Sequence, residues 1–233
     1  MRVDVLTLFP AMFDGVLGES ILKRARDAGV LDVRLTNFRD YAEGRHKKVD
    51  DTAYGGGPGM VLKCEPVFSA VRAVLGDDQD AHLVLLTPQG KTLTQNKVRE
   101  LAGKRRIVML CGHYEGYDER IRQGFPWDEI SIGDYVLTGG ELAAMVVIDA
   151  VARLLPGTLG DETSATEESF EQGLLEYPQY TRPPVYEGMA IPDILLSGHH
   201  EEIAKWRRRM AEERTRERRP DLWRQYMDGG AQG

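Results

Sequence analysis

Three short apolar segments of this chain each run into a loop that contains glycine. They are HLVLLTPQG at 82–90, RIVMLCGHYEGYDER at 106–120 and EISIGDYVLTGGE at 129–141. Short apolar strands that alternate with helices are typical of an α/β domain with a largely parallel sheet. Ligands bind to such sheets beyond the carboxyl ends of the strands. The sequence therefore predicts one site that the three loops share.

The rest of the chain supplies further elements of the same kind. The hydrophobic pattern predicts strands over 3–9 and 31–38 and helices over 20–29, 64–76 and 142–155. The polar stretch 39–59 is unusually long for a loop of a compact domain, and loops of that length are often functional.

The composition changes after residue 160, where we expect a domain boundary. Residues 1–160 are predicted to form the α/β domain, 161–173 a polar linker, and 174–233 a small helical domain with helices within 193–210 and 212–226. The segment from Lys205 to Arg219 is rich in arginine, which is typical of a solvated helix and also of a phosphate-binding surface.

Composition and motif searches exclude several classes of protein. The 233 residues carry a net charge of −7, which disfavours nucleic-acid binding by the whole surface, and two isolated cysteines favour a reducing compartment. Neither a membrane span nor a secretory leader is expected, so we predict a cytoplasmic protein. The P-loop, GxGxxG, HExxH and GxSxG motifs are absent.

Small residues at the three predicted strand ends permit close approach of the backbone to a ligand. Any one glycine is explained as well by a tight turn between packed elements. Three such loops together, with Tyr114, Glu115 and Tyr135 among them, favour a ligand pocket. Backbone groups there could bind a flat, polar ligand such as adenine.

Six motifs in order resemble one family over essentially the whole chain. They are YGGGPGM, CGHYEGYDER, SIGDYVLTGGEL, LPGTLG, YTRPPVYEG and LSGHHEEI followed by WR. They resemble the motifs of bacterial tRNA (guanine-N1)-methyltransferases of the TrmD type, which belong to the SPOUT class. The resemblance implies an α/β trefoil-knot domain that binds S-adenosylmethionine, a mostly parallel sheet with flanking helices, and a small all-α C-terminal domain.

The resemblance assigns the methyl donor to the three loops already singled out. The implied donor-binding residues are Leu86, Thr87, Pro88 and Gln89 in the first loop, Gly112, Tyr114, Glu115 and Gly116 in the second, and Ser131, Ile132, Gly133, Tyr135, Leu137, Gly139 and Gly140 in the third.

The implied reaction transfers a methyl group to N1 of guanine 37 in tRNA, beside the anticodon. N1 carries a proton at neutral pH, so the reaction needs a general base there and positive charge near O6. The resemblance gives the base to Glu168, where the family usually has aspartate, and the positive charge to Arg153. Without the resemblance, Glu168 reads as a linker acid and Arg153 as an outward-facing charge at a helix end.

The resemblance also implies residues that contact tRNA. In the long polar loop they are His46, Asp50, Tyr54, Gly55, Gly56, Gly57 and Gly59, with Lys47 and Lys48 as neighbours; in the C-terminal domain they are Ser197, His199, Lys205, Arg207 and Arg208, with His200 as a neighbour. Phosphate contacts would position the RNA, and the target guanine would leave its stack.

The family works as a homodimer with the active site at the subunit interface, and a magnesium dependence is implied without an assigned site. Two alternatives stay open at this point. One is a related SPOUT methyltransferase with another target nucleotide, and the other is a non-catalytic RNA-binding relative, which the replacement of aspartate by Glu168 would fit.

Overall fold

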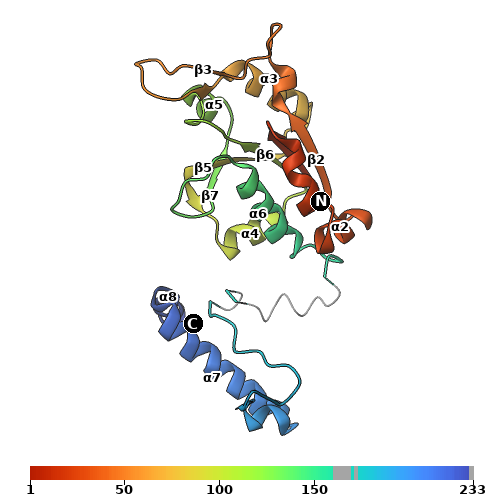
Figure 1. Ribbon diagram of the computed structural model, residues 1–233, viewed down its shortest axis with the longest axis vertical. Coiled ribbons are helices and arrows are strands. Elements are labelled where there is room, and N and C mark those ends of the chain that lie inside the picture. The colour runs from red at the N-terminus through yellow and green to blue at the C-terminus, as the bar shows by residue number, and fades with distance from the viewer. Residues whose placement is uncertain (160–168, 171–172, 231–233) are drawn as a thin grey trace. The chain divides into compact units, whose positions relative to one another are not determined.

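The computed structural model describes residues 1–159, 169–170 and 173–230, apart from the side chains of 229 and 230. The chain divides into two compact units, Met1–Gly160 and Asp161–Gly233, which are described separately (Figure 1). Within the described residues, no helix combines the length and the apolar character needed to cross a membrane.

A five-stranded sheet forms the first unit, and every strand pairing in it is parallel. The strands lie in the order β2–β1–β6–β5–β7, which confirms the predicted α/β class. Their bounds are β1 Arg2–Thr7, β2 Asp32–Asn37, β5 His82–Thr92, β6 Arg106–Cys111 and β7 Asp128–Ser131. The long polar loop contributes a separate small pair, β3 Asp50–Asp51 with β4 Val61–Leu62.

Helices cover both faces of the sheet, which explains why β6 is apolar at almost every position. Ile107, Met109 and Cys111 belong to one core with residues of α2, α4 and α6. Val108 and Leu110, which point the other way, belong to a second core with residues of α3 and α5 (Figure 1). The helices are η1 Pro10–Phe13, α1 Asp14–Leu17, α2 Ser20–Asp27, η2 Phe38–Tyr41, α3 Cys64–Leu75, α4 Gln95–Ala102, α5 Glu119–Gly124 and α6 Glu141–Ala152.

Five of these helices, η1, α1, η2, α4 and α5, were not predicted from the hydrophobic pattern, and two of the five, α4 and α5, have a clear start signal in the sequence. Both are short, but each begins at a residue that caps it. The Thr94 side chain accepts a hydrogen bond from the backbone of Lys97 at 3.4 Å, and the Asp118 side chain accepts one from the backbone of Arg120 at 2.9 Å. Threonine and aspartate are preferred N-caps, so the signal was present in the sequence.

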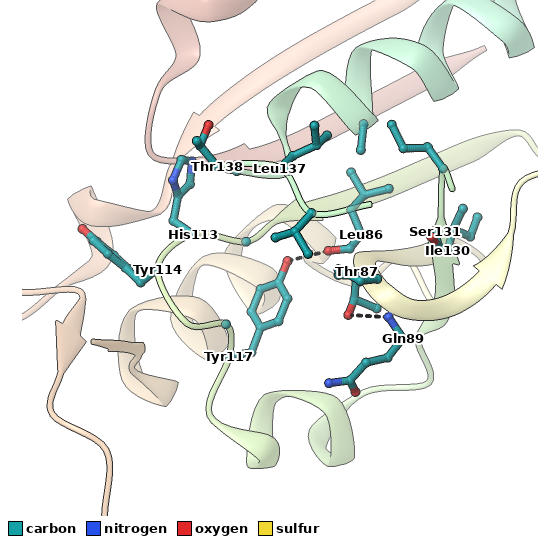
Figure 2. A pocket seen from close by; sticks show the side chains of 18 of the residues that line it. Leu86, Thr87, Gln89, His113, Tyr114, Tyr117, Ile130, Ser131, Leu137 and Thr138 are labelled. Carbon is teal, nitrogen blue, oxygen red and sulfur yellow. Dashed lines mark hydrogen bonds between the residues drawn. The ribbon is translucent and has the colours of Figure 1, made fainter. Parts of the chain in front are cut away.

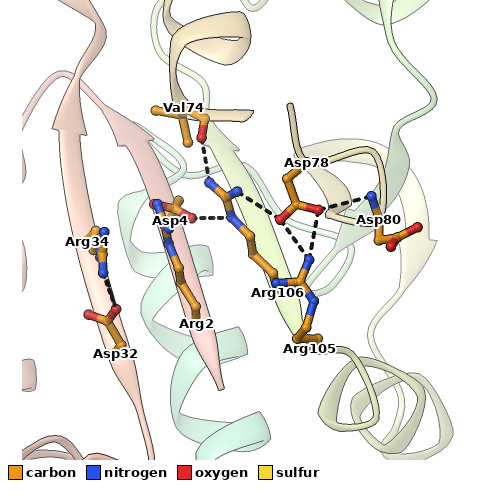
Figure 3. A network of polar contacts seen from close by, with 9 residues as sticks. All are labelled: Arg2, Asp4, Asp32, Arg34, Val74, Asp78, Asp80, Arg105 and Arg106. Carbon is orange, nitrogen blue, oxygen red and sulfur yellow. Dashed lines mark hydrogen bonds and ion pairs between the residues drawn. The ribbon is translucent and has the colours of Figure 1, made fainter. Parts of the chain in front are cut away.

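A buried ion network ties the amino-terminal ends of β1 and β6 to the end of α3 (Figure 3). Arg106 donates from Nε to Asp4 at 2.8 Å, from one terminal nitrogen to Asp78 at 3.0 Å and from the other to the Val74 carbonyl at 2.6 Å. Arg105 donates to both carboxylate oxygens of Asp78 at 2.8 Å. The guanidinium of Arg106 is therefore buried with a partner on each side, as a buried charge requires.

The second unit consists mainly of helices, in agreement with the predicted helical C-terminal part. A two-residue hairpin, β8 Val185–Tyr186 with β9 Met189–Ala190, and the 3-10 helix η4 Asp193–Leu196 precede α7 His200–Arg218 and α8 Pro220–Gly230. The expected break after residue 210 is wrong, because no glycine or proline interrupts α7. The break falls instead before Pro220, a residue well suited to the first turn of a helix.

Candidate functional site

A cavity of about 340 Å³ lies at the carboxyl ends of β5, β6 and β7 (Figure 2). Its size falls in the range of small-molecule sites. All fifteen residues assigned to the methyl donor line this cavity: Leu86, Thr87, Pro88, Gln89, Gly112, Tyr114, Glu115, Gly116, Ser131, Ile132, Gly133, Tyr135, Leu137, Gly139 and Gly140. The three loops therefore share one cavity, while their contact with a donor stays a prediction.

The first loop is an interruption within β5. Leu86 and Lys91 both align with Ile130 of β7, so residues 87–90 bulge out of the pairing with β7 between them. The expected end of this strand at Gly90 is therefore wrong, because pairing resumes and Thr92 aligns with Ser131. A Cβ at Gly90 would meet backbone atoms of Glu129 and Ile130, so glycine is needed where the loop rejoins the sheet.

The second and third loops contact each other through the backbone atoms of two glycines. The amide of Gly140 donates to the Gly112 carbonyl at 2.9 Å. A Cβ at Gly140 would lie 2.8 Å from Cα of Cys111 and 2.9 Å from the Gly112 nitrogen. Because these are backbone atoms next to a buried strand, they have little freedom to move, and only glycine permits the contact.

Tyr117 supports the floor of the cavity from the second loop. Its hydroxyl lies 3.2 Å from the Leu86 carbonyl oxygen and 3.1 Å from that of Leu110, so its proton is shared between the ends of β5 and β6 (Figure 2). Burial raises the pKa of Tyr117 well above its usual value, so the hydroxyl stays protonated as a donor. The side chain thus fixes the spacing of two strand ends that border the cavity.

A buried carboxylate, Glu141, links the second loop to the end of β1. Its side chain is 1% exposed. Oε1 accepts a hydrogen bond from the Thr7 hydroxyl at 2.6 Å, and Oε2 lies 2.7 Å from Nε2 of His113. The His113 ring packs against Phe9, with centroids 4.8 Å apart, and itself lines the cavity. Glu141 is also the first residue of α6, where the helix dipole favours a negative charge.

Sequence reasoning missed eight residues that line the cavity. Most of them could have been predicted, because they are sequence neighbours of assigned residues in the same three loops. Glu119 and Arg122 are different: they come from α5, whose cap at Asp118 was the available signal, and they form an ion pair at 3.0 Å. The eight are His113, Tyr117, Glu119, Arg122, Ile130, Val136, Thr138 and Ala143.

One group of potential metal ligands occurs among the described residues, and it lies away from the cavity. His82, Glu100 and Asp128 hold ligand atoms within 4.8 Å of one another. His82 and Asp128 begin β5 and β7, whereas the cavity lies at the other ends of these strands. The Lys97 ammonium lies 2.7 Å from Glu100 and 3.2 Å from Asp128, so a cation already neutralises the acids. The arrangement does not suit a catalytic metal.

Of the two predicted catalytic residues, only Arg153 lies within the described part of the chain. Glu168 lies outside the described residues. Arg153 is the C-cap residue of α6 and is half-buried. Ala143 is the last residue of α6 that lines the cavity, and Arg153 follows it by ten positions. Arg153 therefore lies about 15 Å further along the helix, at 1.5 Å per residue.

Most of the predicted tRNA contacts are exposed. In the first unit Tyr54 is fully exposed, and His46 and the glycines Gly55, Gly56, Gly57 and Gly59 are exposed, while Asp50 begins β3 and is half-buried. In the second unit Ser197, His199, Lys205 and Arg208 are exposed, and Arg207 lies over the Tyr177 ring at 4.8 Å from its centroid. Exposure permits contact with RNA in each unit separately.

Comparison with known proteins gives one consistent result. Residues 1–225 match the family model described as tRNA (Guanine-1)-methyltransferase TrmD. A tRNA (guanine-N(1)-)-methyltransferase of Geobacillus kaustophilus is 59% identical over 97% of this chain and 93% of its own length. Proteins of the same name from Moorella thermoacetica and Dehalococcoides mccartyi are 57% and 56% identical, each over 95% of this chain and 90% of their own length.

Proposed function

Because the chain belongs to the TrmD family of tRNA (guanine-1)-methyltransferases, and is thus an enzyme that methylates N1 of guanine in tRNA, we propose that its target is guanine 37. We further propose that S-adenosylmethionine, the methyl donor of the family, binds in the cavity at the ends of β5, β6 and β7. The observation that carries the donor site is the convergence of three glycine-containing loops on one cavity.

The donor site suits an adenosyl group for two physical reasons. The three loops line the cavity with several glycines, where no side chain separates the ligand from backbone groups that can hydrogen-bond the edge of a base. Apolar side chains such as Leu86, Ile132 and Leu137 provide surfaces against which a flat ring can pack. Glu115 at the rim adds a carboxylate that can accept hydrogen bonds from ribose hydroxyls or attract the sulfonium.

The proposed chemistry is a direct displacement. The N1 proton passes to the carboxylate of Glu168, the freed electron pair of N1 forms a bond to the methyl carbon, and the carbon–sulfur bond breaks with its electron pair on sulfur. Arg153 stabilises the negative charge that develops on O6 as N1 loses its proton. Glutamate performs the same proton transfer as aspartate, with one more methylene to accommodate.

Mass mapping of a transcribed tRNA tests the target. After incubation with S-adenosylmethionine, we expect a gain of one methyl at nucleotide 37 in a transcript with guanine at 36 and 37, and none when adenine replaces guanine 37. Transcripts with and without guanine at 36 report the dependence on the neighbouring base. A methyl group elsewhere in the wild-type transcript would overturn the assignment. Added EDTA tests the magnesium dependence that the resemblance implies.

A homodimer with a shared active site forms the second part of the proposal. The support comes from one stripe of α6, on which Leu142 and Val146 are followed at helical spacing by the exposed Asp149 and then by Arg153. Leu142 is 48% and Val146 45% exposed, and Phe9 and Met12 at η1 are also exposed. Exposed apolar side chains of this kind suit burial against a second copy. Arg153, remote from the cavity of its own chain, would then face the partner.

Mixing two inactive variants tests whether the site is shared. Gly140→Ala is designed to lose the donor site and Arg153→Ala the O6 contact, so each alone should be inactive. If Arg153 serves the partner's cavity, random mixing restores roughly a quarter of the wild-type sites in a two-fold dimer. Mixtures that remain inactive, or Leu142→Arg and Val146→Arg variants that keep the wild-type sedimentation coefficient and activity, would contradict the shared site.

The exposed basic and aromatic residues of both units are proposed to bind tRNA. We expect Lys205→Ala to weaken tRNA binding without a change in donor affinity, because we assign its ammonium to a phosphate of the tRNA, away from the donor cavity. A filter-binding series at several salt concentrations measures this effect, since losing one phosphate contact reduces the salt dependence of binding by about one unit. An unchanged slope would remove Lys205 from the proposed surface.

A further inference from the structure

The glycine-rich loop at 54–59 is joined to the second cavity loop by backbone hydrogen bonds. The Glu115 amide donates to the Met60 carbonyl at 3.0 Å, and the Leu62 amide donates to the Gly116 carbonyl at 3.0 Å. The Asp118 amide then donates to Leu62 at 3.0 Å, and Leu62 pairs in parallel with Tyr117. The two segments therefore form one short ladder, and neither can shift along the other without breaking these bonds.

The Gly59 position lies directly against a cavity-lining side chain. A Cβ built at Gly59 would overlap the carboxylate oxygen Oε1 and the Cγ atom of Glu115, and would lie 2.7 Å from Cδ. Because Cγ is close to the backbone, Glu115 cannot avoid the overlap by moving its carboxylate alone. It would have to rotate about its first side-chain bond, while its amide is held by Met60. Gly59 thus leaves room for the orientation that Glu115 adopts.

The other glycines of this loop have no such contact. Gly55, Gly56 and Gly57 have positive φ values of 86°, 80° and 123°, and a Cβ at any of them would have nothing within 4 Å. Gly59 has a φ of 83°, close to the 80° of Gly56. Its contact with Glu115 distinguishes Gly59 from the other three glycines.

We propose that Gly59 is a positioning residue for the methyl-donor site: it sets the orientation of Glu115 in the cavity and thereby couples the tRNA-facing loop to donor binding. The inference rests on the proposed function, which places the donor in the cavity and tRNA at the glycine-rich loop. Contacts that tRNA makes with residues 54–59 change the affinity for the donor through Glu115. By thermodynamic linkage, a bound donor changes the affinity for tRNA by the same factor.

Donor affinity in the absence of tRNA provides the test, measured by calorimetry with S-adenosylhomocysteine as a non-reactive probe. We expect Gly59→Ala to weaken binding about tenfold, as overpacking of a close contact costs of this order. Gly56→Ala is the matched control, since it introduces the same backbone strain without the overlap, and its affinity should stay within about twofold of the wild type. Equal affinities of the two variants would overturn the inference.

A double-mutant cycle with Glu115→Ala isolates the contact. Without the Glu115 side chain, the added methyl at position 59 has free space, so we expect Gly59→Ala to have no further effect on probe affinity in that background. The same loss in both backgrounds would show that the methyl acts by another route and would overturn the inference. A wild-type protein that fails to bind the probe would instead contradict the proposed function.

The coupling to tRNA is measured on the wild type and on Gly59→Ala. We expect saturating S-adenosylhomocysteine to change the tRNA affinity of the wild type by a factor of about five or more, a typical coupling strength. In Gly59→Ala this factor should fall toward one. An equal factor in the two proteins would overturn the coupling.

Discussion

Nε2 of His113 lies 2.7 Å from Oε2 of Glu141, although the two residues are 28 positions apart in the chain. The contact brings the loop after β6 to the first turn of α6. A third partner, Thr7 at the end of β1, donates to the other carboxylate oxygen. The buried Glu141 side chain therefore links the end of β1, the loop after β6 and the start of α6 behind the cavity. Each of its two carboxylate oxygens has a hydrogen-bond partner.

Truncation of Glu141 should destabilise the first unit. Glu141→Ala leaves the Thr7 hydroxyl and the His113 ring without a buried partner, and we expect a loss of about 3 kcal/mol in the free energy of unfolding. Glu141→Gln retains two hydrogen-bonding atoms and should lose about 1 kcal/mol. Urea unfolding monitored by circular dichroism measures both. Equal stabilities of the alanine variant and the wild type would contradict a structural role for this carboxylate.

Addition of a methyl group at Gly140 should abolish donor binding. The Cβ of Gly140→Ala would press on Cα of Cys111 and the nitrogen of Gly112, neither of which can move without displacing a buried strand. We expect probe affinity to fall at least about tenfold, as for other overpacked sites. Gly15→Ala serves as the control, because a Cβ there has nothing within 4 Å. Calorimetry with S-adenosylhomocysteine compares the two variants.

The sequence pattern was sufficient for the sheet and for the location of the cavity. Apolar runs with glycine-containing ends predicted β5, β6 and β7, and the cavity lies at the interruption within β5 and at the carboxyl ends of β6 and β7. Two details depended on packing that periodicity does not encode. β5 resumes after the loop at 87–90 because Lys91 and Thr92 can still pair with β7. The trefoil knot, a property of the whole chain path, was implied by the family resemblance alone.

Polar contacts between residues far apart in the chain could not be predicted from the sequence, for a different reason. Glu141 reads as an ordinary N-terminal acid of a helix, and nothing in its neighbourhood in the sequence points to Thr7, 134 positions away. Likewise, Gly59 looks like any other member of YGGGPGM until the position of Glu115 is known. Such partners follow from the strand order, so they can be found only once the fold is built.

Acid should weaken the network around Asp78 in a defined pH range. Hydrogen bonds from Arg106 and then Arg105 lower the pKa of Asp78 from 3.8 to about 2. A lowered pKa in the folded state means that the carboxylate stabilises the fold fully above pH 3.8, and that this contribution is lost as the pH falls toward 2. Asp78→Asn should therefore be less stable than the wild type at pH 6, and the difference should narrow between pH 4 and pH 2.

Urea unfolding midpoints of the two proteins at pH 6, 4, 3 and 2 measure this effect. The comparison cancels the contribution of carboxyl groups outside the Arg105–Arg106 network, because these are shared by both proteins. Asp32→Asn is a matched control, since Asp32 pairs with Arg34 on the exposed face of β2 at 2.9 Å and should shift the midpoint little at any pH. Wild-type and Asp78→Asn curves that run parallel down to pH 2 would contradict the assigned role.

Both cysteines should resist alkylation in the folded protein, for different reasons. Cys111 is fully buried in β6, and burial raises its pKa well above the usual value. Cys64 is half-buried; burial, followed by its contact with Asp118, raises the pKa of Cys64 to about 11. At pH 8 about one Cys64 in a thousand would then be the reactive thiolate. Iodoacetamide should label neither residue in buffer and both in urea, as peptide mass mapping can measure.

Asp118→Asn separates the effect of burial on the alkylation of Cys64 from the effect of the neighbouring Asp118 charge. Asparagine can cap α5 as aspartate does, so the helix start is retained, but the negative charge beside Cys64 is removed. Because that charge helps to raise the pKa of Cys64, its loss should speed the alkylation of Cys64 while Cys111 stays unreactive in the same molecule. An unchanged rate would mean that burial alone protects the Cys64 thiol, and equal acceleration at both cysteines would mean that the variant has loosened the fold.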